Sequence, residues 1–180
     1  MKATGIVRRI DDLGRVVIPK EIRRTMRIRE GDPLEIYTSK EGEVIFKKYS
    51  LMGGVDEFAA QICETLSKTT GVSVAVTDRD SVIAAAGSAR RDLIGKRIST
   101  ELEQIMEDRA IYRAQEGKRS VYVTDTLDRC CAAIAAPIIS EGDALGLVLF
   151  VENEGESHVG ETEYKLAQAI ASFLGRHMES

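Results

Sequence analysis

The sequence of 180 residues contains no tryptophan, and its aromatic content is only 5%. This scarcity argues against a large aromatic core and against a surface on which many nucleic-acid bases could stack. Long apolar runs are also absent, and the N-terminal residues lack the apolar central block of a signal peptide. We therefore expect no membrane association and a cytoplasmic location.

Cysteine and histidine are too few for most site chemistry. The sequence has three cysteines, an odd number, and they lack the spacing of a disulfide framework: Cys63, Cys130 and Cys131. His158 and His177 do not complete a zinc site with them, and no base is visible beside the adjacent cysteines. We expect buried cysteines, no metal site, no cofactor and no catalytic residue, so the chain is not expected to be an enzyme.

A basic stretch at residues 87–97, GSARRDLIGKR, looks only superficially like a phosphate-binding loop. A Walker motif begins with Gly and ends with Ser or Thr, whereas Arg90 and Arg97 occupy those positions here. We interpret the stretch as a solvated loop, and an anionic ligand held by its cationic side chains is the alternative.

The charges are unevenly distributed along the sequence. The whole chain has a net charge of -4, but residues 1–50 contain twelve Lys and Arg against eight Asp and Glu. The excess is concentrated in residues 1–29, which hold nine basic and three acidic residues, while residues 51–180 have a net charge of -8. This asymmetry predicts a polyanionic partner for the N-terminal segment, with a merely solvated helix face as the alternative.

The first fifty residues are predicted to form short strands and one helix. β-Branched residues favour the strands, DDLG is a turn signal, and Pro19 fits the first turn of a helix that has Ile22 and Met26 on its buried face. So few elements bury little core, and we expect two copies to fold together. The expected elements are strands at 4–10 and 15–19, a helix at 19–28, and a hairpin of strands at 34–39 and 44–49.

A linker at 50–54 separates this segment from a mixed α and β pattern. Apolar side chains recur every four residues at Phe58, Ile62 and Leu66, and again near the C-terminus, which predicts two amphipathic helices flanking an antiparallel sheet of five or six strands. The expected helices are 55–71, 99–109 and 160–178, and the expected strands are two within 72–87 and one each at 120–125, 130–140 and 144–153.

Two family resemblances follow from these segments. Residues 4–49, with the core LGRVVIP, closely resemble the AbrB-type DNA-binding domain of transition-state regulators in spore-forming bacteria, and the order of elements after the linker is similar to a GAF domain. The resemblance implies an α+β chain: a dimeric swapped-hairpin β-barrel over residues 1–52, then a GAF-like α/β domain with an antiparallel sheet and flanking helices over 53–180.

The AbrB-type resemblance implies that the N-terminal domain binds double-stranded DNA. Guanidinium groups bind phosphate oxygens in pairs of hydrogen bonds and can read guanine edges. Nothing in the segment looks like a dedicated recognition helix, so readout of DNA shape is expected beside readout of sequence. The resemblance implies that Arg8, Arg15, Arg23 and Arg24 contact the DNA. Arg9 lies on the expected strand of Arg8, and Lys20 lies on the expected helix of Arg23 and Arg24.

The AbrB-type resemblance implies a transcriptional regulator of sporulation genes, either activator or repressor. The GAF-like domain is expected to sense a small molecule and to join two dimers into a tetramer through its helices, although the helices could instead cover the sheet within a plain dimer. Small side chains on the strands leave room for a ligand pocket or allow close helix packing. The alternative function is the antitoxin of a toxin–antitoxin pair, because swapped-hairpin heads also occur there. The small side chains are Ala84, Ala85, Ala86, Ala132, Ala133, Ala135 and Ala136.

Overall fold

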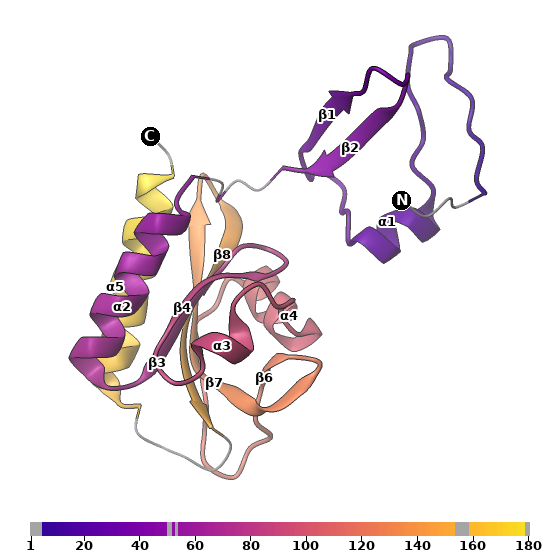
Figure 1. Cartoon of the computed structure of the whole chain (residues 1–180). Coiled ribbons are helices and arrows are strands. Elements are labelled where there is room, and N and C mark those ends of the chain that lie inside the picture. The colour runs from indigo at the N-terminus through magenta and orange to yellow at the C-terminus, as the bar shows by residue number, and fades with distance from the viewer. Residues whose placement is uncertain (1–4, 50–51, 53, 154–158, 179–180) are drawn as a thin grey trace. The chain divides into compact units, whose positions relative to one another are not determined.

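A computed structural model describes residues 5–49, 52, 54–153 and 159–178. The chain divides into two units, Met1–Tyr49 and Ser50–Ser180 (Figure 1). We call the first unit the head and the second unit the body.

The head contains one short helix and one hairpin. Helix α1 (Lys20–Met26) follows Pro19, whose φ of -57° suits the first helical turn, and it ends at Arg27 with a left-handed φ of 51°. Strands β1 (Leu34–Thr38) and β2 (Val44–Lys48) pair antiparallel, with Ile36 opposite Phe46. The helix and hairpin predicted from the sequence are therefore present, although α1 is shorter than expected.

The strands expected at 4–10 and 15–19 are not formed within the described residues 5–19 of the single chain. The segment runs out to a turn at Asp11–Gly14 and returns to α1 (Figure 1). Two backbone hydrogen bonds close the turn, from the Asp11 amide to the Arg15 carbonyl (3.0 Å) and from the Gly14 amide to the Asp11 carbonyl (3.0 Å), and no ladder continues from them in the described segment. Strand propensity alone does not form a strand, because every strand needs a neighbour to receive its hydrogen bonds.

The body is built on one antiparallel sheet with the order β4-β3-β8-β7-β5 and with β6 also paired to β7. The central strands are buried on both faces, as their nearly continuous apolar runs require. The two-residue strand β5 was not expected. The strand bounds are β3 (Ser73–Thr77), β4 (Val82–Ala86), β5 (Tyr112–Arg113), β6 (Tyr122–Thr124), β7 (Leu127–Ser140) and β8 (Asp143–Asn153).

Helices cover both faces of this sheet and create two cores. Helices α2 (Asp56–Thr70) and α5 (Glu161–His177) lie side by side on one face, and α3 (Arg90–Leu93) and α4 (Thr100–Asp108) lie on the other (Figure 1). The small strand side chains are divided between the cores: Ala84, Ala86 and Ala136 pack under α2 and α5, whereas Ala85, Ala132 and Ala135 pack towards α3 and α4.

Two glycines mark close backbone approaches, one between a helix and the sheet and one between neighbouring strands of the sheet. A Cβ at Gly175 of α5 would overlap the carbonyl oxygen of Ile139 in β7, and a Cβ at Gly146 would overlap the carbonyl oxygen of Thr77 in β3. Close approach of the α5 backbone to β7 therefore depends on the missing side chain.

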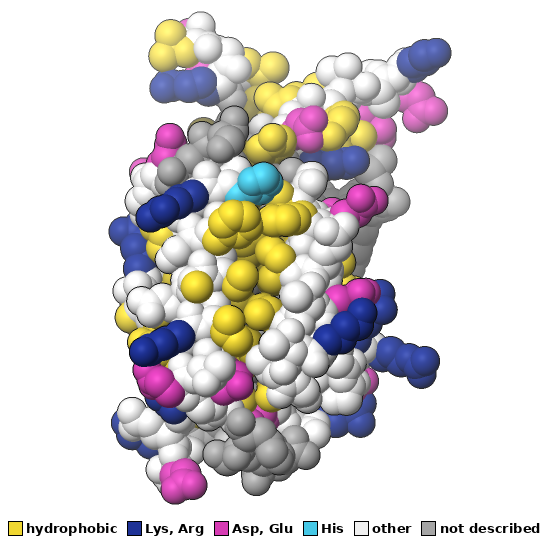
Figure 2. Space-filling view, turned by 90° about the vertical axis from the view of Figure 1, so that its left-hand side faces the viewer, with side chains coloured by type: hydrophobic (Ala, Val, Ile, Leu, Met, Phe, Trp, Pro, Cys, Tyr) yellow, Lys and Arg dark blue, Asp and Glu magenta, His cyan; other side chains and the backbone are white. Residues whose placement is uncertain are grey.

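The outer surface of the α2–α5 pair carries apolar side chains. Figure 2 shows them as a stripe that runs along the two helices. The rings of Phe58, Phe173 and His177 are mutually in contact, with centroid separations of 5.2 to 6.2 Å. Phe173 remains 50% exposed.

Candidate nucleic-acid interface

The cationic side chains predicted to contact DNA are all exposed on the head. They come from three parts of the fold: the extended segment before the turn, the residue that closes the turn, and helix α1. Exposure leaves their charged groups available to a polyanion. In chain order these residues are Arg8, Arg9, Arg15, Lys20, Arg23 and Arg24.

Arg15 is held at the turn by the carboxylate of Asp11. Oδ1 of Asp11 accepts hydrogen bonds from the amides of Leu13 (3.0 Å) and Arg15 (2.8 Å), and Oδ2 accepts one from Nε of Arg15 (2.8 Å). The backbone and side-chain hydrogen bonds from Arg15 lower the pKa of Asp11 below its usual value. The carboxylate is therefore ionised at neutral pH beside a guanidinium that is 69% exposed.

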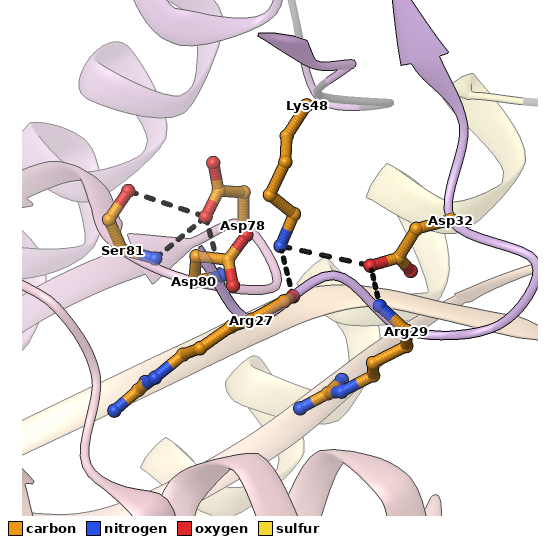
Figure 3. A network of polar contacts seen from close by, with 7 residues as sticks. All are labelled: Arg27, Arg29, Asp32, Lys48, Asp78, Asp80 and Ser81. Carbon is orange, nitrogen blue, oxygen red and sulfur yellow. Dashed lines mark hydrogen bonds and ion pairs between the residues drawn. The ribbon is translucent and has the colours of Figure 1, made fainter. Parts of the chain in front are cut away.

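The end of α1 is tied to the hairpin by a second polar network (Figure 3). Nζ of Lys48 donates to the carbonyl of Arg27 (2.8 Å) and lies 3.8 Å from Oδ2 of Asp32, which also accepts the amide of Arg29 (2.8 Å). The side chains of Arg27 and Arg29 extend in the same direction (Figure 3). Sequence reasoning missed this network, because its lysine lies 21 residues from the carbonyl that it binds.

The head also exposes apolar side chains that one copy does not cover. Among the described residues, fourteen large hydrophobic residues are exposed, and twelve of them lie between Ile6 and Tyr49, including Val7 at 88% and Val17 at 69% exposed. Ile22, expected on the buried face of α1, is half-buried, and Met26 is 44% exposed. So many exposed apolar side chains on a small unit are typical of an interaction surface.

The cysteines of the body are buried, as the sequence indicated. Burial raises the pKa of Cys63 to about 12 and also raises the pKa of Cys130. Thiols that remain protonated are poor nucleophiles and poor metal ligands. Within the described residues no cluster of three or more His, Cys, Asp or Glu side chains could hold a metal ion.

Among the described residues, the body has two cavities with polar linings. One of about 260 Å³ lies where α2 ends and β3 and α3 begin, and its lining includes Ser73, Ser88 and Glu152. The other, of about 280 Å³, is lined by the start of α4 and the β6–β7 hairpin, including Glu101 and Arg119, which lie 3.5 Å apart. The cationic side chains of 87–97 line neither of these two cavities, and nor do the seven strand alanines. No helix in the described part of the chain is long and apolar enough to cross a membrane.

Two family profiles match the sequence and together span almost all of it. The profile described as stage V sporulation protein T C-terminal, transcription factor, matches residues 54–179. The profile described as antidote-toxin recognition MazE, bacterial antitoxin, matches residues 7–51.

Individual relatives agree with this division. Stage V sporulation protein T of Bacillus subtilis is 46% identical over 179 residues, which cover 99% of each chain. The transition state regulatory protein AbrB of the same organism is 63% identical over 49 residues, or 27% of this chain and 50% of that protein. The crystal structure of the A. aeolicus nlh2 GAF domain covers 70% of this chain and 86% of its own, at 16% identity and a TM-score of 0.50. At that identity the last comparison shows only the fold.

Proposed function

The chain belongs to the stage V sporulation protein T family of transcription factors, and we propose that it controls sporulation genes by binding double-stranded DNA through the cationic residues of its head. The head is of the AbrB type and the body is GAF-like. We assign residues 1–52 to DNA binding and residues 53–180 to assembly and sensing.

The exposed cationic side chains of the head carry the proposal. Arg8, Arg9 and Arg15 on the segment around the turn, with Lys20, Arg23 and Arg24 on α1, form a surface suited to phosphate oxygens. If four arginines in each copy of a dimer reach phosphates, about eight contacts give a slope of log K against log salt of roughly -7. The net negative charge of the whole chain does not argue against DNA binding by the head, because the acidic excess belongs to the body, which is a separate unit.

A dimer of heads accounts for the apolar surface and for the missing strands. The segments at 5–10 and 15–19 have strand-forming sequences but no strand partners in one copy. A second copy would supply those partners and would cover side chains such as Val7 and Val17. This arrangement is the swapped-hairpin barrel that the AbrB-type resemblance implies.

The α2–α5 surface is proposed to join two such dimers into a tetramer. Its apolar stripe includes the half-exposed ring of Phe173 in contact with Phe58 and His177. Helix pairs of this kind bury their stripes in four-helix packing. Because the head and the body would then contact different copies, two dimers would close into one assembly.

The body is further proposed to sense a small molecule without transforming it. Six of the seven strand alanines are packed into the two cores and the seventh, Ala133, is buried, so the polar cavities near Ser73 and near Arg119 are the candidate positions. We propose no enzymatic role, because the three cysteines of the body are buried and burial raises the pKa of Cys63 and of Cys130.

The antitoxin alternative receives support only from the profile matched by residues 7–51. Antitoxins with this head usually carry a short, poorly folded tail that wraps the toxin, whereas here the described residues 56–153 and 159–177 form a sheet covered by helices, with two packed cores. The whole-length relative is a sporulation protein. These findings do not favour an antitoxin.

Fluorescence anisotropy of labelled duplex DNA over a salt series tests DNA binding by the full chain. Arg15→Ala and Arg23→Ala should each weaken binding and flatten the salt slope by about one to two units, since each removes a phosphate contact from both copies. Lys40→Ala is the matched control, because it removes an exposed positive charge from the β1–β2 loop instead. Equal effects of all three substitutions would show only a loss of net charge and would contradict the proposed surface.

A further inference from the structure

We propose that Asp11 is a positioning residue for DNA binding, which holds the guanidinium of Arg15 in the orientation that meets a phosphate. The inference rests on the proposed function of the head and adds an acidic residue to its cationic surface. No charge-based argument would select an aspartate for that task, because a carboxylate near DNA repels phosphate.

The turn places the carboxylate between the backbone and the side chain that it orients. The amide of Gly14 donates to the Asp11 carbonyl (3.0 Å), and the amide of Asp11 donates to the Arg15 carbonyl (3.0 Å). Gly14 has a φ of 78°, which glycine adopts without strain. Oδ1 is occupied by the two turn amides, so Oδ2 faces Nε of Arg15 at 2.8 Å.

The ion pair leaves the phosphate-binding part of Arg15 available. A guanidinium has five N–H groups, and the bond to Oδ2 uses the one on Nε. The four N–H groups on the two Nη atoms form the fork that binds a phosphate through two hydrogen bonds. An arginine oriented before binding loses less rotamer entropy when it meets DNA, so the pair favours the complex.

Asp12 provides a matched comparison for Asp11. It is the next residue, is exposed, and carries the same charge. In the described part of the chain, the turn bonds and the ion pair to Arg15 come from Asp11 rather than from Asp12. The electrostatic repulsion of DNA is similar at the two positions, whereas the positioning contact is not.

The test measures binding of duplex DNA by the full-length protein with Asp11→Asn and Asp12→Asn. An asparagine at position 11 keeps an oxygen to accept the two turn amides, but its NH₂ group then faces Nε of Arg15, which is also a donor. We expect Asp11→Asn to weaken binding about fivefold at low salt, the size that exposed ion pairs reach when both copies of a dimer are changed. Asp12→Asn should strengthen binding, because it only removes a negative charge.

Two further readouts separate positioning from damage to the turn. In an Arg15→Ala background, Asp11→Asn should no longer weaken binding, because the side chain it orients is gone. In the free protein, the Nε–Hε NMR signal of Arg15 should shift and exchange faster in Asp11→Asn, while the amide signals of Leu13 and Arg15 change little.

The possible failures are distinguishable. If Arg15→Ala weakens binding but Asp11→Asn strengthens it as Asp12→Asn does, Asp11 acts only as a negative charge and the inference is overturned. The inference is also overturned if Asp11→Asn weakens binding equally with and without Arg15. If Arg15→Ala itself leaves binding unchanged, the proposed DNA surface fails first, and the role of Asp11 fails with it.

Discussion

Replacing Phe173 by alanine should separate a tetramer into dimers. The ring lies on the outer face of α5 and is 50% exposed in one copy. A phenylalanine buries roughly 200 Å² when fully covered, so about 100 Å² in each copy remains to be buried in an interface. At about 25 cal/mol per Å², this area contributes about 2.5 kcal/mol in each copy, or about 5 kcal/mol in an interface with two-fold symmetry.

That value is an upper limit, because interface area is only partly converted into affinity. Recovery of half of it, about 2.5 kcal/mol, still corresponds to a dissociation constant roughly 70-fold higher. Sedimentation equilibrium over a concentration series should therefore show wild-type tetramers and Phe173→Ala dimers at the same concentration. The dimers should persist, because the heads remain paired.

Gln168→Ala is the control, since position 168 is exposed on α5 about 140° around the helix from residue 173. Thermal unfolding establishes that Phe173→Ala remains folded despite the loss of its contact with Phe58. A folded Phe173→Ala protein that remains tetrameric at every concentration would refute the assignment of the α2–α5 stripe as the interface.

Two other features of the body make separate predictions. Gly175→Ala should lower the free energy of unfolding by about 2–4 kcal/mol, because the new Cβ would overlap the Ile139 carbonyl and push α5 away from β7. Urea unfolding measures this loss. An unchanged urea midpoint would contradict the close approach of α5 to β7. Burial raises the pKa of Cys63 to about 12, so Cys63 should resist iodoacetamide at pH 8 in the native protein and react with it in guanidinium chloride. Mass spectrometry of the peptides measures the labelling, and labelling of Cys63 in the native protein would contradict the prediction.

Much of the body could be predicted from residue patterns. The four-residue spacing of Phe58, Ile62 and Leu66 predicted α2, and the apolar runs predicted β7 and β8, because one apolar face or a doubly buried strand leaves a direct trace in the sequence. Strand β5 was missed, since Tyr112–Arg113 pairs with β7 without any apolar pattern of its own.

The candidate site could be predicted from the sequence only in part. The sequence indicated the cationic residues of the head, and the structure places Arg15 and Arg23 on the surface as that prediction requires. The sequence could not show that Asp11 turns its carboxylate towards Nε of Arg15, because that contact depends on the path of the backbone through the turn.

The sequence by itself determined the family, the α+β class and the concentration of positive charge in the first thirty residues, because these depend on residue identity and local spacing. Tertiary structure decided which residues meet across long separations. It packed the strand alanines into two cores and joined Lys48 to the end of α1. It also left residues 5–10 and 15–19 without a neighbouring strand in one copy, since hydrogen bonding between strands is a property of neighbours in space.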